Sequence, residues 1–163
     1  MEIKWPWELS RVQHLPALAL AVHVLRDEEQ TARAWREFQL QVVDWVGNNP
    51  HGLGVNWACP MDIGIRAANF AAANCLFGGF DNRSTPGWHR LFLRSMRCHL
   101  GLLQRVLTEG AGNNHAVAEA AALYLSAAFL PVLPQRAACL HRARTALTRQ
   151  LERQVREDGT HFE

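Results

Sequence analysis

Four polar side chains of complementary chemistry crowd a short stretch of the second half of the chain. Asn113, Asn114 and His115 directly follow a Gly-Ala-Gly run, and Glu119 comes four residues after the histidine. Amides can bind a carboxylate or a sugar hydroxyl, and an imidazole near a carboxylate can move a proton. The stretch is therefore a candidate site for an acidic or sugar substrate.

This cluster lies where a loop opens into a helix. Asn113 or Asn114 suits the N-cap position, and His115 and Glu119 share one helix face. A cap with a buried polar pair is the alternative to a functional site. The following helix is almost wholly apolar. A histidine and a carboxylate at its start would therefore be partly desolvated and would have shifted pKa values, which favours the functional interpretation.

A second constellation lies near the N-terminus, in the run Lys-Trp-Pro-Trp-Glu-Leu-Ser-Arg at positions 4–11. Trp7 could stack on a sugar ring beside the charges of Glu8 and Arg11. The same residues could instead form a packing anchor with a Glu8–Arg11 pair along a helix, because tryptophan serves cores and interfaces alike. Both interpretations stay open.

A third constellation follows a glycine-containing loop that could expose Asn56 and Trp57 to a cleft. Arg66 comes next, on an otherwise apolar helix. A buried arginine needs a partner. That partner is either Asp62, four residues earlier, or an acidic ligand.

Composition excludes several functional classes. The 163 residues are 48 % hydrophobic and 20 % charged, as in an ordinary globular domain, and the net charge of +2 gives no indication of a nucleic-acid partner. No apolar stretch is long enough to span a bilayer. Neither cysteines nor histidines show the spacing of a metal site, so no metal or cofactor is expected. Every cation except Lys4 is arginine, which binds carboxylate and sulfate bidentately, although genomic base composition would produce the same bias.

Helical periodicity covers almost the whole chain and predicts an all-α fold. Two of the expected helices are nearly all apolar and alternate with two amphipathic ones, which indicates inner helices shielded by outer ones. We expect a partial (α/α) toroid of about six helices in antiparallel hairpins, with Ser84 or Thr85 as a cap and Tyr124 in the core. The expected helices cover residues 7–26 with an interruption at Pro16, 28–46, 60–77, 86–109, 115–130 and 135–156.

Several short segments of the chain, taken in order, resemble segments of the heparinase II/III-like family of polysaccharide lyases, which includes alginate lyases. The matching pieces are 4–11, Asn49-Pro50, Gly54–Trp57, Met61–Arg66 with Asn69, Asn113–His115 with Glu119, Gln154–Gly159 and Phe162-Glu163. The resemblance implies an (α/α) toroid followed by β-sandwich domains, and β-elimination beside a uronic acid. It assigns Asn114 and His115 as catalytic neutralisers of the substrate carboxylate. It implies substrate-binding roles for Trp7, Arg11, Asn56, Trp57, Arg66, Asn113 and Glu119.

The family's catalytic tyrosine would follow the segment that ends here in Phe162-Glu163. We therefore expect residues 1–163 to be one partial toroid domain, a fragment that is inactive alone and lacks the β-sandwich domains. The expected partners are an acidic polysaccharide and the missing C-terminal part, with no membrane and no nucleic acid. The family is usually periplasmic or secreted, although the N-terminus does not read as a signal peptide.

Two other functions stay open. A toroid glycoside hydrolase would use a carboxylate pair drawn from Glu8, Asp62 and Glu119, held about 5–10 Å apart. A helical carbohydrate-binding or scaffold module would use the same surfaces without catalysis.

Overall fold

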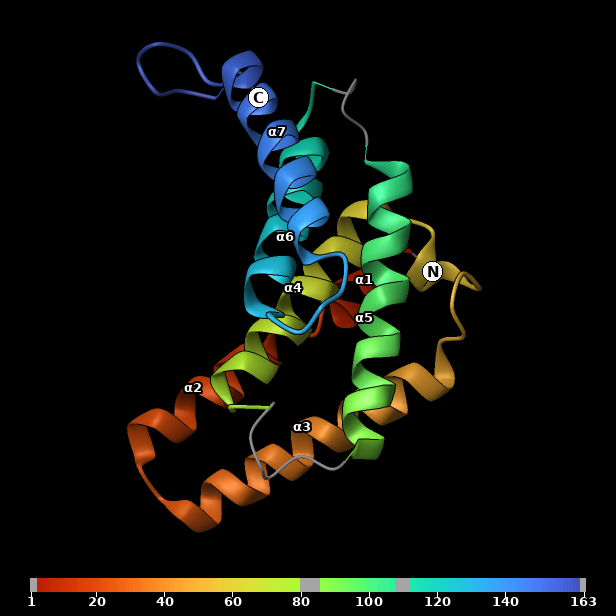
Figure 1. Ribbon diagram of the computed structural model, residues 1–163, viewed down its shortest axis with the longest axis vertical. Coiled ribbons are helices and arrows are strands. Elements are labelled where there is room, and N and C mark those ends of the chain that lie inside the picture. The colour runs from red at the N-terminus through yellow and green to blue at the C-terminus, as the bar shows by residue number, and fades with distance from the viewer. Residues whose placement is uncertain (1–2, 80–85, 108–111, 162–163) are drawn as a thin grey trace.

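The computed structural model describes residues 3–79, 86–107 and 112–161, which contain helices and no β-strand. An isolated β-bridge joins Val155 to His161. Ser84, Thr85, the first two residues of the Gly-Ala-Gly run and Phe162-Glu163 lie outside these ranges. The helices are α1 (Lys4–Ser10), α2 (His14–Leu25), α3 (Glu28–Asn48), the 3₁₀ helix η1 (Val55–Trp57), α4 (Pro60–Leu76), α5 (Pro86–Val106), α6 (Asn114–Phe129) and α7 (Arg136–Gln154) (Figure 1).

Local side-chain chemistry sets the start of several helices. The Asp27 carboxylate accepts a bond from the Gln30 amide at 3.0 Å and caps α3. Pro60 occupies the first position of α4, where its missing N–H costs nothing. The Asn113 side chain accepts from the Ala116 amide at 3.2 Å and caps α6. Of the two predicted candidates, Asn113 and Asn114, the cap is thus Asn113.

The first predicted helix is divided into α1 and α2, so the described residues hold one α-helix more than expected. The break falls at Val12, whose φ of +51° is left-handed and ends regular helix geometry. Pro16 then lies inside the first turn of α2, where a backbone N–H would have no helical partner anyway. The break therefore precedes the proline.

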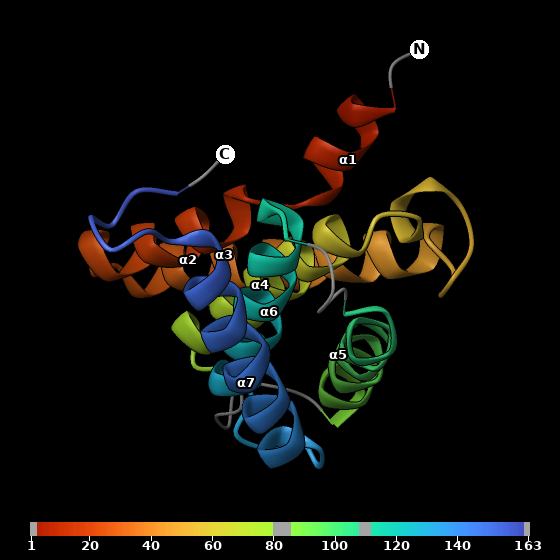
Figure 2. The ribbon, with the colours of Figure 1, turned by 90° about the horizontal axis from the view of Figure 1, so that it is seen from above.

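Three antiparallel hairpins, α2–α3, α4–α5 and α6–α7, stack side by side into an open arc (Figure 1). The inner helices α2, α4 and α6 run in the same direction, and α4 packs against both of the others. Figure 2 shows α4 and α6 at the centre, with α5 and α7 outside them. The all-α arrangement of a partial toroid is confirmed.

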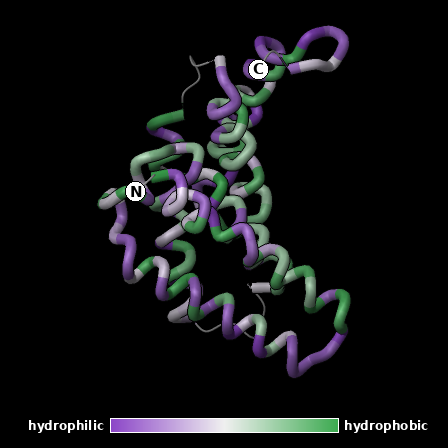
Figure 3. The backbone as a smooth tube through the Cα atoms, turned by 180° about the vertical axis from the view of Figure 1, so that it is seen from behind, coloured by the Kyte–Doolittle hydropathy of each residue, from purple (hydrophilic) through white to green (hydrophobic). Residues whose placement is uncertain are grey.

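Apolar contacts hold the hairpins together. α4 and α6 approach closely at Gly64, where an added Cβ would lie 3.0 Å from the Cβ of Ala122. Between α3 and α5, an aromatic cluster forms around Phe38, which lies 5.5 Å from Trp88 and 5.4 Å from Phe77, measured between ring centroids. Hydropathy alternates along α3, whereas apolar colours dominate α6 (Figure 3).

The inner helices are not buried on every side. Tyr124 of α6 is 38 % exposed, so its predicted place in the core is wrong. Its neighbour Leu125 is 44 % exposed as well. Among the described helices, none combines the length and apolarity needed to cross a membrane.

Candidate functional site

The N-terminal helix α1 is attached to the start of α4 through its polar side chains. The indole N–H of Trp7 donates to the backbone oxygen of Val55 at 2.8 Å. Arg11 donates from Nε to Asp62 at 2.6 Å and also binds Glu8. The Glu8–Arg11 pair of the packing-anchor interpretation is thus present, and Arg11 extends it to a second carboxylate on α4.

Arg66 of α4 lies at the centre of this junction and is fully buried. Its guanidinium donates to Ser10 Oγ at 2.8 Å, to the Asn56 backbone oxygen at 2.9 Å and to His99 Nε2 at 3.0 Å. The same group lies 4.2 Å from the centre of the Trp45 ring. Arg66 therefore connects α1, η1 and α5 from inside the fold.

Asp62 is not the hydrogen-bonding partner of Arg66, although it lies four residues before it. The Asp62 carboxylate bonds Arg11 instead. Burial lowers the pKa of Arg66 to about 9, and the charge of Asp62 partly offsets this effect. At neutral pH the guanidinium is thus a buried cation, held by neutral acceptors and an aromatic face.

His99 of α5 is the acceptor that this cation requires. Nε of Arg66 can only donate, so Nε2 of His99 carries the lone pair and Nδ1 carries the proton. Nδ1 then donates to the Ser95 backbone oxygen at 2.8 Å. Burial, followed by the charge of Arg66, lowers the pKa of His99 to about 3. The imidazole is therefore neutral at physiological pH.

Sequence reasoning missed three members of this cluster, namely Ser10, Trp45 and His99. In the sequence, the histidines were considered only as metal ligands, for which their spacing is unsuitable. A usable signal existed for His99, because it shares the apolar face of α5 with Phe92 and Met96. A lone histidine on such a face indicates a buried acceptor or donor that needs a partner.

The α6 cluster is built differently and faces solvent. Asn114 and His115 occupy the first turn of α6 and are exposed. The buried side chain of Gln154 donates to the backbone oxygen of Asn113 at 3.0 Å and ties the turn to α7. The turn is therefore both accessible and held in place.

Glu119 lies one turn further into α6 and is only 2 % exposed. Its carboxylate is inside the fold, while the His115 side chain is exposed. The structure thus places Asn113, Asn114 and His115 at the accessible start of α6, with Glu119 behind them.

The Arg66 cluster and the α6 turn lie toward the starts of α4 and α6. These two helices run in the same direction, so both groups lie on the same side of the arc (Figure 1). The close contact of Gly64 with Ala122 aligns the two helices. At a rise of 1.5 Å per residue, Asn114 lies about 12 Å along the axis from that contact, and Asp62 about 3 Å. The α6 turn therefore projects beyond the buried Arg66 cluster.

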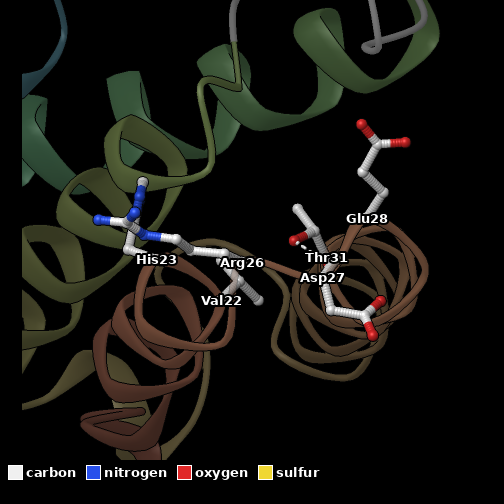
Figure 4. A pocket seen from close by; sticks show the side chains of 6 residues that line it. All are labelled: Val22, His23, Arg26, Asp27, Glu28 and Thr31. Atoms are coloured by element: carbon white, nitrogen blue, oxygen red, sulfur yellow. Dashed lines mark hydrogen bonds between the residues drawn. The ribbon is translucent and has the colours of Figure 1, made fainter.

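A ligand could reach part of the Trp57 side chain but not Arg66. Arg66 is wholly enclosed, whereas Trp57 is 8 % exposed and lines a hollow of about 520 Å³ with Trp45 and His51. A larger hollow of about 860 Å³ lies at the turn between α2 and α3 (Figure 4). There the carboxylates of Asp27 and Glu28 point away from each other and from Arg26. They form no converging acid pair.

Residues able to bind a metal do not gather in the described ranges: no group of three or more histidine, cysteine, aspartate or glutamate side chains meets there. The four cysteines are free, with Cys139 buried and Cys75 exposed.

Comparisons with known proteins agree with this architecture. The family model described as Heparinase II/III N-terminus matches residues 1–163. Among solved structures, heparan sulfate lyase HepC from Pedobacter heparinus is similar, with a TM-score of 0.79 and 25 % sequence identity. The match covers 99 % of this chain and 25 % of that protein. A search of curated proteins found no match. The chain therefore belongs to the heparinase II/III family and corresponds to its N-terminal region.

Proposed function

We propose that the chain supplies the carboxylate-recognising part of a lyase that cleaves a uronate-containing polysaccharide by β-elimination. The observation that carries this proposal is the exposed first turn of α6, with Asn114 and His115 side by side. A helix start presents free N–H groups and a positive dipole end, which favour a bound carboxylate. The amide of Asn114 and the ring of His115 add side-chain donors at the same place.

Neutralising the carboxylate is the step that these residues would perform. The proton on C5 of the uronate becomes more acidic when the carboxylate charge is held by donors, because the enolate-like intermediate is stabilised in the same way. A base then removes that proton, the C4–O bond breaks as an acid protonates the leaving oxygen, and a C4–C5 double bond forms. The family resemblance implies that the base is a tyrosine beyond Glu163, so we expect the 163-residue chain to bind uronate without cleaving it.

The remaining candidate residues have separate roles in this proposal. Trp7 and Arg11 hold α1 against η1 and α4. Arg66 donates a hydrogen bond to the backbone oxygen of Asn56 and so holds the loop in place. Because Arg66 is fully enclosed, it positions the loop and does not contact sugar. Trp57 is the aromatic side chain of this group that borders a hollow.

A hydrolase receives less support from the geometry. Asp62 and Glu119 are 1 % and 2 % exposed, and Glu8 is engaged with Arg11. A hydrolase needs two carboxyl groups on either side of an accessible glycosidic bond. Two buried carboxylates do not meet that requirement.

The proposal is tested by titrating the chain with uronate oligosaccharides and by measuring the ultraviolet absorbance of unsaturated uronate products. We expect binding that weakens by about tenfold in Asn114→Ala, as for loss of a charge-assisted hydrogen bond. We expect no unsaturated product from the chain alone. Unchanged binding in Asn114→Ala would contradict the proposed role of the α6 turn. Formation of an unsaturated product would contradict the expectation that the base lies outside these 163 residues.

A further inference from the structure

A row of arginines lies along one exposed face of α5. Arg90, Arg94, Arg97 and Arg105, here called the α5 stripe, are all exposed. Their spacings of four, three and eight residues place them on one side of the helix. The buried residues Phe92, Met96 and Leu103 occupy the opposite side. At 1.5 Å per residue the stripe is about 22 Å long.

Within the described residues, no acidic side chain pairs with these arginines. No hydrogen bond or ion pair with another described residue holds any of the four arginines. The sequence of α5 contains no aspartate or glutamate. Like charges three or four residues apart destabilise a helix by a few tenths of a kcal/mol per pair. By contrast, α3 mixes Arg33 and Arg36 with four acidic residues.

The stripe borders a groove and not a flat surface. Two hollows, of about 660 and 520 Å³, share His51, Arg90, Arg94 and Cys98 and therefore adjoin. The described residues that line the two hollows include no carboxylate. Aromatic faces of Trp45 and Trp57 line one of them. The groove thus combines a linear row of guanidinium groups with flat apolar surface.

We infer that the α5 groove is a second binding site, for a sulfated polysaccharide chain. Guanidinium groups bind sulfate bidentately, and a row of them about 22 Å long matches a linear polyanion better than a single small anion. α5 runs antiparallel to α6, so Arg105 lies at the end where α6 begins (Figure 1). A chain bound along the stripe would therefore be held near the α6 turn. The choice of a polysaccharide as the occupant rests on the proposed function.

The test is calorimetric titration of the chain with a heparin-derived octasaccharide and with the same octasaccharide after chemical desulfation. In Arg94→Ala/Arg97→Ala we expect about tenfold weaker binding of the sulfated ligand and a weaker dependence on salt, because two charged contacts are removed. Affinity for the desulfated ligand should change less than about twofold. The matched control Arg33→Ala/Arg36→Ala removes the same charge from α3 and should leave both affinities unchanged.

Equal affinity of the wild-type chain and Arg94→Ala/Arg97→Ala for the sulfated ligand would overturn the inference. So would a duplex DNA of equal charge that binds the groove more tightly than the octasaccharide. Asn114→Asp separates the two proposals. If it leaves all binding intact while the stripe variant loses sulfated binding, the groove stands and the α6 proposal fails; the reverse pattern rejects the groove alone.

Discussion

The Nε–H of Arg66 donates to Nε2 of His99 at 3.0 Å, inside the fold and across 33 residues of sequence. This bond requires an imidazole with a lone pair at Nε2, so His99 must be neutral for the junction between α4 and α5 to form. The two side chains are therefore coupled, since a proton added to one would face the positive charge of the other.

This coupling predicts that acid destabilises the fold through His99. Its pKa is about 3 in the folded chain against 6.5 for an ordinary histidine, so the unfolded state binds a proton first as pH falls. The stabilising contribution is complete above pH 6.5 and is lost as pH falls toward 3, at roughly 1 kcal/mol per pH unit. His99→Gln keeps an acceptor for Arg66 and cannot titrate. Its free energy of unfolding, from urea titrations, should fall less steeply across this window.

The control for that experiment is His141→Gln, which changes an exposed histidine on α7. Its stability should follow the wild-type pH profile. Parallel profiles for the wild type and His99→Gln would show that His99 does not titrate as described.

Removing the guanidinium of Arg66 should destabilise the chain strongly. Arg66→Met leaves buried acceptors on Asn56 and His99 without a donor and removes one of the two donors to Ser10 Oγ, at a cost of roughly 3 kcal/mol. Arg66→Lys should restore only part of the loss. The three acceptors are bound by three different guanidinium nitrogens, and the single nitrogen of an ammonium cannot reach all of them. Urea titration measures both variants. Full recovery in Arg66→Lys, or a loss no larger than in the exposed control Arg33→Met, would show that the fork geometry is not required.

The close approach of Gly64 to Ala122 makes the α4–α6 contact sensitive to one methyl group. Gly64→Ala puts two Cβ atoms 3.0 Å apart and should cost about 1–3 kcal/mol as the helices move. Adding Ala122→Gly removes the clash and should recover part of that loss. Gly101 has nothing within 4 Å of an added Cβ, so Gly101→Ala should stabilise by about 0.5–1 kcal/mol. If Gly64→Ala stabilised equally, the contact would be looser than described.

Local chemistry in the sequence predicted much of this fold. Asn113 and Pro60 begin helices where their types indicate, and the apolar character of 60–77 and 115–130 identified the inner pair. The sequence predicted an interruption of the first helix at Pro16, but the break lies at Val12, which adopts a left-handed conformation that its side chain does not favour. The partners of Arg66 were not predictable from spacing. Ser10 lies 56 residues away in the chain, and only the packing of α1 against α4 brings it there.

The candidate site was likewise predictable from local sequence only in part. The start of α6 could be located from sequence because a cap, a histidine and a helix pattern lie within a few residues of one another. The burial of Arg66 was open, because a charged residue on an apolar helix is equally compatible with a ligand and with an internal partner. The α5 stripe was visible only as an excess of arginine, since its meaning depends on which residues lie opposite it in the fold.

The most direct test of the account is a titration of wild-type chain and Asn114→Asp with desulfated heparin octasaccharide, and with the same ligand after reduction of its carboxyl groups. A carboxylate at the start of α6 suits the helix dipole, so the variant should fold at least as well as the wild type. It should nevertheless repel a uronate. We predict that the wild type binds only the ligand with intact carboxyl groups and that Asn114→Asp weakens this binding by about tenfold or more. Equal affinity of the two proteins, or equal binding of the reduced ligand, would contradict the claim that the α6 turn recognises the uronate carboxylate.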